Sequence, residues 1–261
     1  MGNGTSNWKG ALVAIENSNR LRLYNLVMGV LHAAQGVAVL ALATEFALPV
    51  TATFLEGPPG SAAGPPEVLL DISVAWGVAI FLFLSAVFHW LIISPGFHAR
   101  YLNGLAHHRN HFRWVEYSLS SSVMIVLIAM LTGIGDISAL IALFGVNAAM
   151  IFFGAVQEKY EEPGGSLTPF WLGCLAGIVP WIAIGVYLVS PGTPAEPPGF
   201  VYGIFISLFV FFNVFALNQW LQYRQIGRWR DYLFGERFYI LLSLVAKSAL
   251  AWQVFGGTLA V

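Results

Sequence analysis

The chain has 261 residues, of which 57% are hydrophobic and only 10% are charged, and its net charge is −1. A soluble domain usually carries about 25% charged residues, so this composition excludes an ordinary soluble protein and predicts one that lies in a lipid bilayer. The balanced charge provides no basic field for nucleic acid. The single cysteine, Cys174, excludes an internal disulfide.

Seven apolar runs are long enough to cross a bilayer as helices, which takes roughly 20 residues each. We expect one domain over residues 1–261, of all-α class, built as a bundle of seven membrane-spanning helices. No internal repeat of the transporter kind is evident among the runs. They cover residues 22–44, 72–95, 108–133, 138–157, 169–190, 200–223 and 236–258.

The connection at residues 45–71 is longer than most of the others. It is rich in glycine and proline and contains neither lysine nor arginine. Its segment TATFL has the β-branched and aromatic residues that favour a strand. We therefore expect an ordered loop outside the membrane that contains a short β-hairpin.

The basic residues predict how the bundle is oriented. Eleven of the 12 lie on the same side of the predicted bundle as the N-terminus, and the opposite loops contain none. The positive-inside rule places that side in the cytoplasm and the C-terminus outside, in a multi-pass protein of the cell membrane. The eleven are Lys9, Arg20, Arg22, Arg100, Arg109, Arg113, Lys159, Arg224, Arg228, Arg230 and Arg237.

The twelfth basic residue, Lys247, lies in the middle of the last apolar run. It is roughly ten residues from either end, or roughly 15 Å deep, which is too deep for its side chain to snorkel comfortably. A lysine at this depth costs about 2.5–3.5 kcal/mol and usually marks function. The alternatives are a structural ion pair and a lysine in an apolar pocket that forms a Schiff base with a carbonyl compound.

A charged Schiff base in lipid requires a counter-charge, and Glu116 in the third run is the clear candidate. Ser120 follows Glu116 by four residues and Ser243 precedes Lys247 by four, so each hydroxyl shares a helix face with its charge. Alternatively, each serine bonds only its own helix backbone. Glu116 lies near the cytoplasmic end of its run, so it reaches Lys247 only if residues 102–114 are helical and the span begins near residue 105.

Two histidines, His32 and His89, are embedded in the first two runs, in the same half of the bilayer as Glu116. They are either separately satisfied or part of a hydrated cluster that holds a proton, since histidine titrates near neutral pH. The basic stretch from His107 to Arg113 is expected to be a solvated face. The outer half of the spans has no deep titratable carboxylate, which argues against pumping but leaves a water-filled channel open.

Seven spans, a lysine in the last and a glutamate in the third resemble the microbial rhodopsins. Five segments are more specific and are similar to those of heliorhodopsins, a likeness that extends over residues 22–258. The predicted topology agrees with it, because heliorhodopsins have the N-terminus inside, the reverse of other rhodopsins. The segments are RWVEYSLSSSVMIVLIA, FGVNAAMI, GIVPWI, PGFVYGI and LVAKSALAWQ.

The resemblance implies all-trans retinal on Lys247 as a Schiff base, with Glu116 as its counterion. It implies that His32 and His89 belong to a polar cavity on the cytoplasmic side that accepts a proton. It also implies that the hairpin in residues 45–71 helps to form a homodimer. The further pocket residues it implies are Ser121, for which nothing else argues, Ser243, Met124, Asn147, Phe212 and Gln219.

The function expected from the resemblance is that of a light-sensing photoreceptor and not an enzyme. A slow photocycle with internal proton transfer and no net ion pumping would act on a signalling partner of unknown identity. The alternative is a light-gated proton channel or weak proton transporter, which photocurrents would reveal. A third class has no chromophore and uses the Lys–Glu pair in a lipid-facing enzyme or a structural dimer, where Lys247→Arg would be tolerated.

Overall fold

The structure, a computed structural model, describes residues 4–189 and 197–260. Within these residues, seven helices are long and apolar enough to cross a membrane, and they lie on the seven predicted runs. The predicted seven-helix class is thus confirmed. The helices are α1 (Gly4–Leu42), α2 (Val74–Ile93), α4 (His111–Leu131), α5 (Ile137–Tyr160), α6 (Thr168–Val189), α7 (Gly199–Tyr223) and α8 (Tyr232–Val254).

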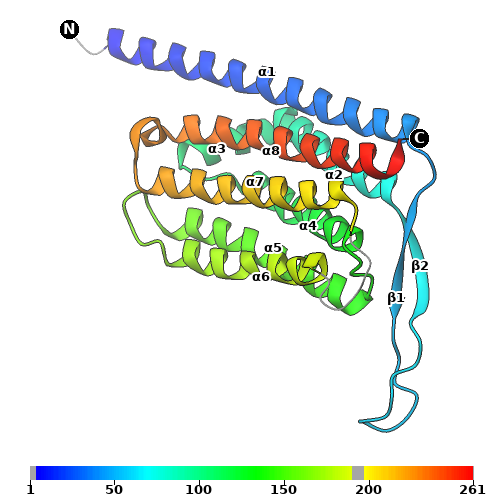
Figure 1. Ribbon diagram of the computed structural model, residues 1–261. Coiled ribbons are helices and arrows are strands. Elements are labelled where there is room, and N and C mark those ends of the chain that lie inside the picture. The colour runs from blue at the N-terminus through cyan, green and yellow to red at the C-terminus, as the bar shows by residue number, and fades with distance from the viewer. Residues whose placement is uncertain (1–3, 190–196, 261) are drawn as a thin grey trace.

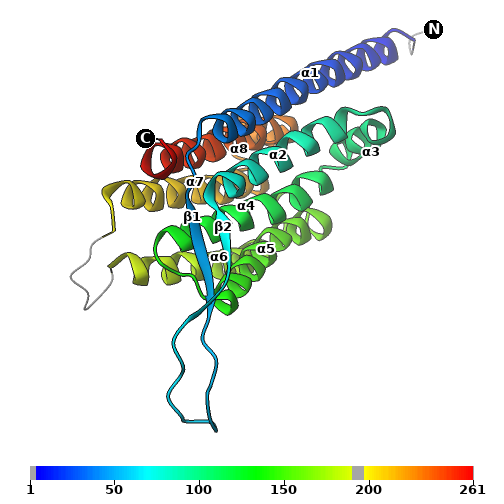
Figure 2. The ribbon, with the colours of Figure 1, turned by 90° about the vertical axis from the view of Figure 1, so that its right-hand side faces the viewer.

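Helix α4 is the central helix of the bundle. Of its most apolar window, 67% is buried inside the protein, compared with 17% to 50% for the other six spans. It lies between α2 and α5 and also contacts α7 (Figure 2). Any side chain on α4 that points inward is therefore enclosed by protein and not by lipid.

The two ends of the bundle differ. One end carries the short helix α3 (Pro95–Ala106), the connection at residues 161–167 and the 3-10 helix η1 (Gly227–Arg230), and we call it the α3 end (Figure 1). The other carries the β-hairpin and the π-helical turn η2 (Phe255–Leu259), and we call it the hairpin end. The predicted outer loop 191–199 lies outside the described residues, apart from its last three.

The expectation of a continuous helix over residues 102–114 is wrong. Helix α3 ends at Ala106, and His108 takes a left-handed backbone conformation with φ of 54°. Helix α4 then begins at His111, because the Asn110 side chain accepts a hydrogen bond from the Arg113 amide at 3.1 Å. Asparagine is among the preferred residues at this capping position.

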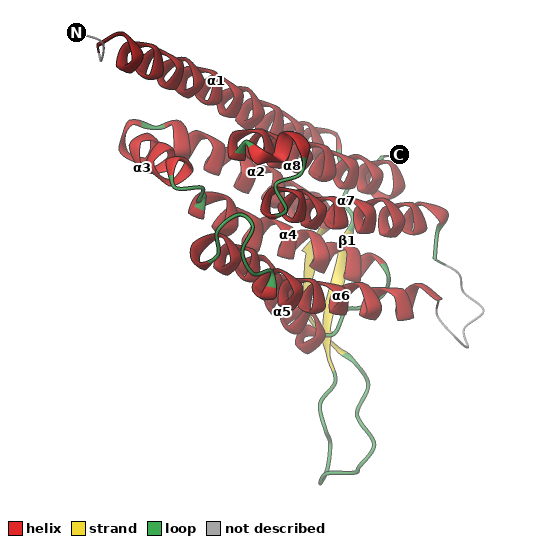
Figure 3. Ribbon diagram, turned by 90° about the vertical axis from the view of Figure 1, so that its left-hand side faces the viewer, coloured by secondary structure: helices red, strands yellow, loops and turns green. Residues whose placement is uncertain are grey.

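The predicted hairpin is confirmed in residues 45–71, and its second strand extends two residues further. Strands β1 (Ala47–Ala52) and β2 (Glu67–Ser73) lie side by side (Figure 3). They pair antiparallel, with a register shift between Val50 and Thr51. A two-stranded hairpin is marginally stable by itself. This one is anchored to the turn between α4 and α5, where the Thr51 amide donates to the Gly135 carbonyl at 2.8 Å.

Buried residues divide the bundle into an apolar and a polar part. The hydrophobic core fills the hairpin half, where Leu82, Ile128 and Leu250 have no exposed surface. Within the described residues, the buried charged side chains all lie between the level of Lys247 and the α3 end. They are Arg113, Glu116, Glu158, Glu236 and Lys247.

Candidate functional site

Lys247 and Glu116 meet as a buried ion pair. The Lys247 Nζ atom lies 2.8 Å from Glu116 Oε1, and both side chains are almost fully buried. Nζ also donates to Ser243 Oγ at 2.9 Å, and Glu116 Oε1 accepts from Ser85 Oγ at 2.7 Å. Buried charges are tolerated when they are paired and hydrogen-bonded in this way.

Lys247 and Glu116 meet although α4 begins at His111 and not near residue 105. They can meet because the start of α4 lies inside the bundle. Its capping residue, Asn110, is buried and donates to Glu236 near the start of α8, at 2.6 Å. From this contact, Glu116 lies six residues further along α4, and Lys247 lies eleven residues further along α8. The difference of five residues corresponds to about 7.5 Å along the helix axis. Side chains on a helix point back toward its N-terminus, so the long lysine side chain spans this offset.

A mostly apolar cavity extends from Lys247 between α4, α5, α6, α7 and α8. Its empty space is about 800 Å³, including its open side. Five of the predicted pocket residues line it, namely Ser121, Ser243, Met124, Phe212 and Gln219. Asn147 is not on the wall but donates to Ser121 and Ser122, at 2.8 and 3.0 Å.

Two neighbouring serines of α4 line the cavity. Ser120 is the one favoured by its spacing from Glu116, and Ser121 is the one implied by the resemblance. Ser121 Oγ donates to the Tyr117 carbonyl at 2.7 Å and accepts from Asn147. Ser120 Oγ is fully buried and has no partner among the described residues. An unpaired buried hydroxyl is costly, and Ser120 Oγ is a hydrogen-bonding group of the cavity wall that no described protein group satisfies.

Apart from Phe212, sequence reasoning did not single out the aromatic residues that wall the cavity. Trp114, Tyr117, Phe215 and Tyr239 line it beside the predicted residues. Their rings contact one another in edge-to-face, tilted and stacked arrangements, with Tyr117 and Phe215 edge to face at a centroid distance of 5.3 Å and Phe215 and Tyr239 stacked at 6.1 Å. Tyr117 lies next to Glu116 in the sequence, and its ring centroid is 5.2 Å from Lys247 Nζ. This adjacency was the available signal for Tyr117.

A second, smaller cavity lies on the α3 side of Glu116. His89 and Glu116 both line it, together with Asn25 and Ser85. His89 Nδ1 lies 2.8 Å from Asn25 Oδ1, and the ring of His32 stacks on that of His89 at 5.6 Å. The two predicted histidines are therefore brought together, with His89 on the cavity wall. Both ring nitrogens of His32 have no partner among the described residues.

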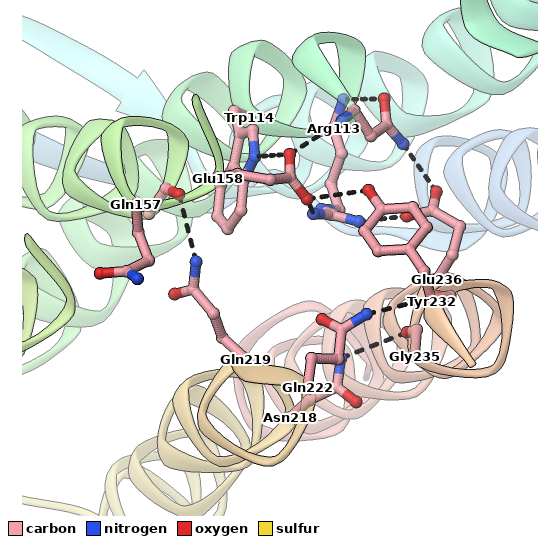
Figure 4. A network of polar contacts seen from close by, with 12 residues as sticks. Arg113, Trp114, Gln157, Glu158, Asn218, Gln219, Gln222, Tyr232, Gly235 and Glu236 are labelled. Carbon is pink, nitrogen blue, oxygen red and sulfur yellow. Dashed lines mark hydrogen bonds and ion pairs between the residues drawn. The ribbon is translucent and has the colours of Figure 1, made fainter. Parts of the chain in front are cut away.

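An ion cluster that was not expected borders this cavity, with Arg113 and Glu236 on the cavity wall. Figure 4 shows the contacts of the cluster. The Arg113 guanidinium pairs with Glu158 at 2.5 Å and with Glu236. Arg113 is 6% exposed, so the prediction that it belongs to a solvated face is wrong, whereas His107 to Arg109 are exposed as predicted. Its position one helical turn before Glu116, on the same helix face, was the available signal.

Glu158 is the most connected member of the cluster. Its Oε2 accepts from the Asn110 amide at 2.8 Å and from Trp114 Nε1 at 2.5 Å. Its Oε1 accepts from the Tyr232 hydroxyl at 2.8 Å. Glu158 and Tyr232 also line a third cavity, open at the α3 end, in which the His108 ring stacks on Tyr232 with centroids 5.0 Å apart.

Comparison with known protein families gives one match. The protein-family model described as heliorhodopsin matches residues 21–259. A search among curated proteins finds no match to the chain. The matched range contains all seven spans apart from the first three residues of the first span, so it covers all three cavities and the ion cluster.

Proposed function

The chain belongs to the heliorhodopsin family and is a retinal-binding, light-sensing protein of the membrane, and we propose that Lys247 binds the retinal as a Schiff base with Glu116 as counterion. The observation that carries the proposal is the buried contact of 2.8 Å between Lys247 Nζ and Glu116 Oε1. Lysine in an apolar pocket is a nucleophile that forms Schiff bases with carbonyl compounds.

The residues around Lys247 fit such a chromophore. The cavity that begins at Nζ is mostly apolar and walled by aromatic rings, as a flat conjugated ligand requires. Ser120, Ser121, Ser243, Met124, Phe212 and Gln219 contribute to its wall, while Asn147 holds Ser121. When bound, all-trans retinal supplies the absorption of visible light and the isomerisation that follows. Retinal extracted in the dark should be the all-trans isomer.

We propose that the proton on Lys247 Nζ points toward the polar side of the pocket and leaves in that direction. Glu116 Oε1 and Ser243 Oγ both lie within 2.9 Å of Nζ, and Glu116 borders the cavity that His89 lines. A proton that leaves Nζ therefore moves toward Glu116, with His89 and His32 behind it. In the hairpin half, the described core is apolar, so the transfer stays internal and no net pumping follows.

We further propose that the α3 end faces the cytoplasm. Arg100, Arg109, Lys159, Arg228 and Arg230 belong to this end, and basic residues accumulate on the cytoplasmic side. Protease added to intact cells should then cleave the hairpin loop at residues 53–66 and spare the connection at 161–167. The reverse pattern would contradict this orientation.

The hairpin is the proposed contact of a homodimer. Val68, Leu69 and Leu70 on β2 are about half exposed, although they belong to a strand outside the spans. Exposed apolar patches of this kind mark interaction sites. Leu70→Glu should lower the mass of the purified particle to that of a monomer, and an unchanged mass would exclude the hairpin as the contact.

The first experiment is a visible spectrum of the protein with all-trans retinal, recorded in the dark. The wild type should show a band in the visible, and Lys247→Ala and Lys247→Arg should not, because neither variant can form the imine. A band of equal strength in Lys247→Ala would place the attachment elsewhere. A colourless wild type would contradict the proposal itself.

A further inference from the structure

We propose that Trp114 is the positioning residue that carries the light-induced change from the retinal cavity to Glu158 and from there to the α3 end. The inference rests on the proposed function, because it requires the chromophore to occupy the cavity beside Lys247. Trp114 touches both regions: it lines the cavity, and its Nε1 donates to Glu158 Oε2 at 2.5 Å (Figure 4).

The indole of Trp114 is held without free space on the side of α5. A Cβ atom at Gly154 would lie 2.5 Å from Cζ3 of the indole and 2.7 Å from Cη2, so only glycine lets α5 approach this closely. Gln219, on the cavity wall, donates to the Gly154 carbonyl at 3.1 Å. Because α5 packs against the indole without a gap, we expect a change in the shape of the cavity to displace the indole relative to Glu158.

A second wall residue reinforces the same connection. The Arg113 guanidinium carbon lies 4.6 Å from the centroid of the Trp114 ring and 4.1 Å from that of Tyr239. Tyr239 also lines the cavity, so two of its aromatic walls make cation–π contacts with one guanidinium. That guanidinium pairs with Glu158 and Glu236. A shift of either ring therefore acts on the same ion cluster.

Glu158 connects the ion cluster to the turn between α3 and α4. Its Oε2 accepts from Trp114 Nε1 and also from the Asn110 amide, which belongs to the turn between α3 and α4. Its Oε1 accepts from the Tyr232 hydroxyl, and the Tyr232 ring stacks on His108 in the same turn. Trp114 is thus connected through the Glu158 carboxylate to Asn110 and Tyr232. These two residues contact the turn that holds the exposed residues His107 to Arg109.

The test compares hydrogen–deuterium exchange in the dark and under illumination, over residues 106–111, in protein loaded with retinal. Trp114→Phe keeps an aromatic wall and removes the indole N–H. It should keep the visible band and lose at least half of the light-dependent exchange of the wild type. Trp171→Phe, at an exposed tryptophan of α6, is the matched control and should keep both.

Tyr232→Phe provides a second variant should Trp114→Phe fail to fold. Tyr232 is absent from the described cavity wall, so its loss should leave the visible band unchanged and halve the light-dependent exchange over residues 106–111. If the variants that fold show the same light-dependent exchange over residues 106–111 as the wild type, the inference is overturned and the proposed function stands. A wild type without a visible band would overturn both.

Discussion

At the scale of the residue, the site depends on whether each buried charge has its partner. Lys247 and Glu116 are each almost fully enclosed, and within the described part of the chain each forms an ion pair only with the other. Breaking a buried pair by removing one partner is strongly destabilising, because the remaining charge is left in an apolar medium. Removing both charges avoids that penalty.

This asymmetry gives a test that needs no chromophore. Glu116→Gln should lower the free energy of unfolding of the retinal-free protein by about 3–5 kcal/mol. The double variant with Lys247→Met should recover most of this loss, because no charge remains buried. Glu162→Gln, at an exposed carboxylate, is the control. Equal stability of the wild type and Glu116→Gln in denaturant titrations would show that the pair carries no stability.

Residue type alone identified part of the site. Lys247 and Glu116 could be found because charged residues are rare inside apolar runs. Arg113, Glu158 and Glu236 lie near the ends of their spans, where a buried charge and a solvated one have the same sequence signature. The walls Trp114 and Tyr239 are two among 20 phenylalanines, 9 tryptophans and 9 tyrosines. Only tertiary packing distinguishes them from the aromatic residues that face lipid.

At the scale of the element, the ends of the helices set the depth of the site. The lengths of the spans follow from their apolar runs, and hydropathy located all seven. The break at residues 107–110 contains neither glycine nor proline, so it could not be recognised from turn-forming residues. Its cause is tertiary: Asn110 caps α4 while it bonds both Glu158 and Glu236.

The start of α5 offers a pH test of an element outside the membrane. Hydrogen bonds from the Ser138 hydroxyl, and then from the Ala139 and Ser138 amides, lower the pKa of Asp136 from its ordinary value of 3.8. Because the folded-state pKa is the lower one, this stabilisation is present above about pH 4 and is lost as the pH falls through the folded-state value.

Acid should therefore loosen the turn that anchors the hairpin, since Thr51 of β1 bridges to Asp136. In the wild type, amide exchange of residues 137–140, corrected for its intrinsic pH dependence, should rise as the pH falls from 5 to 3. Asp136→Asn has no carboxylate to titrate and should show no such rise. An equal rise in both proteins would assign the acid response to other groups.

At the scale of the whole molecule, polarity is distributed unevenly along the membrane normal. Arg113, Glu116, Glu158, Glu236 and Lys247 connect the middle of the bundle with the α3 end, through two cavities and an ion cluster. The hairpin half of the described bundle is filled by an apolar core. We therefore expect a proton and a conformational change to move toward the α3 end, because the described part of the hairpin half offers no matching polar path.

Net transport requires titratable or hydrated groups that reach both surfaces. We therefore expect no sustained photocurrent in voltage-clamped cells that express the loaded protein, at any holding potential. A transient charge movement should remain, because the proton on Lys247 Nζ has acceptors on the α3 side only, and Lys247→Ala should abolish it. A steady current that reverses with voltage would instead require a water path through the core around Leu82, Ile128 and Leu250, and the protein would then be a channel.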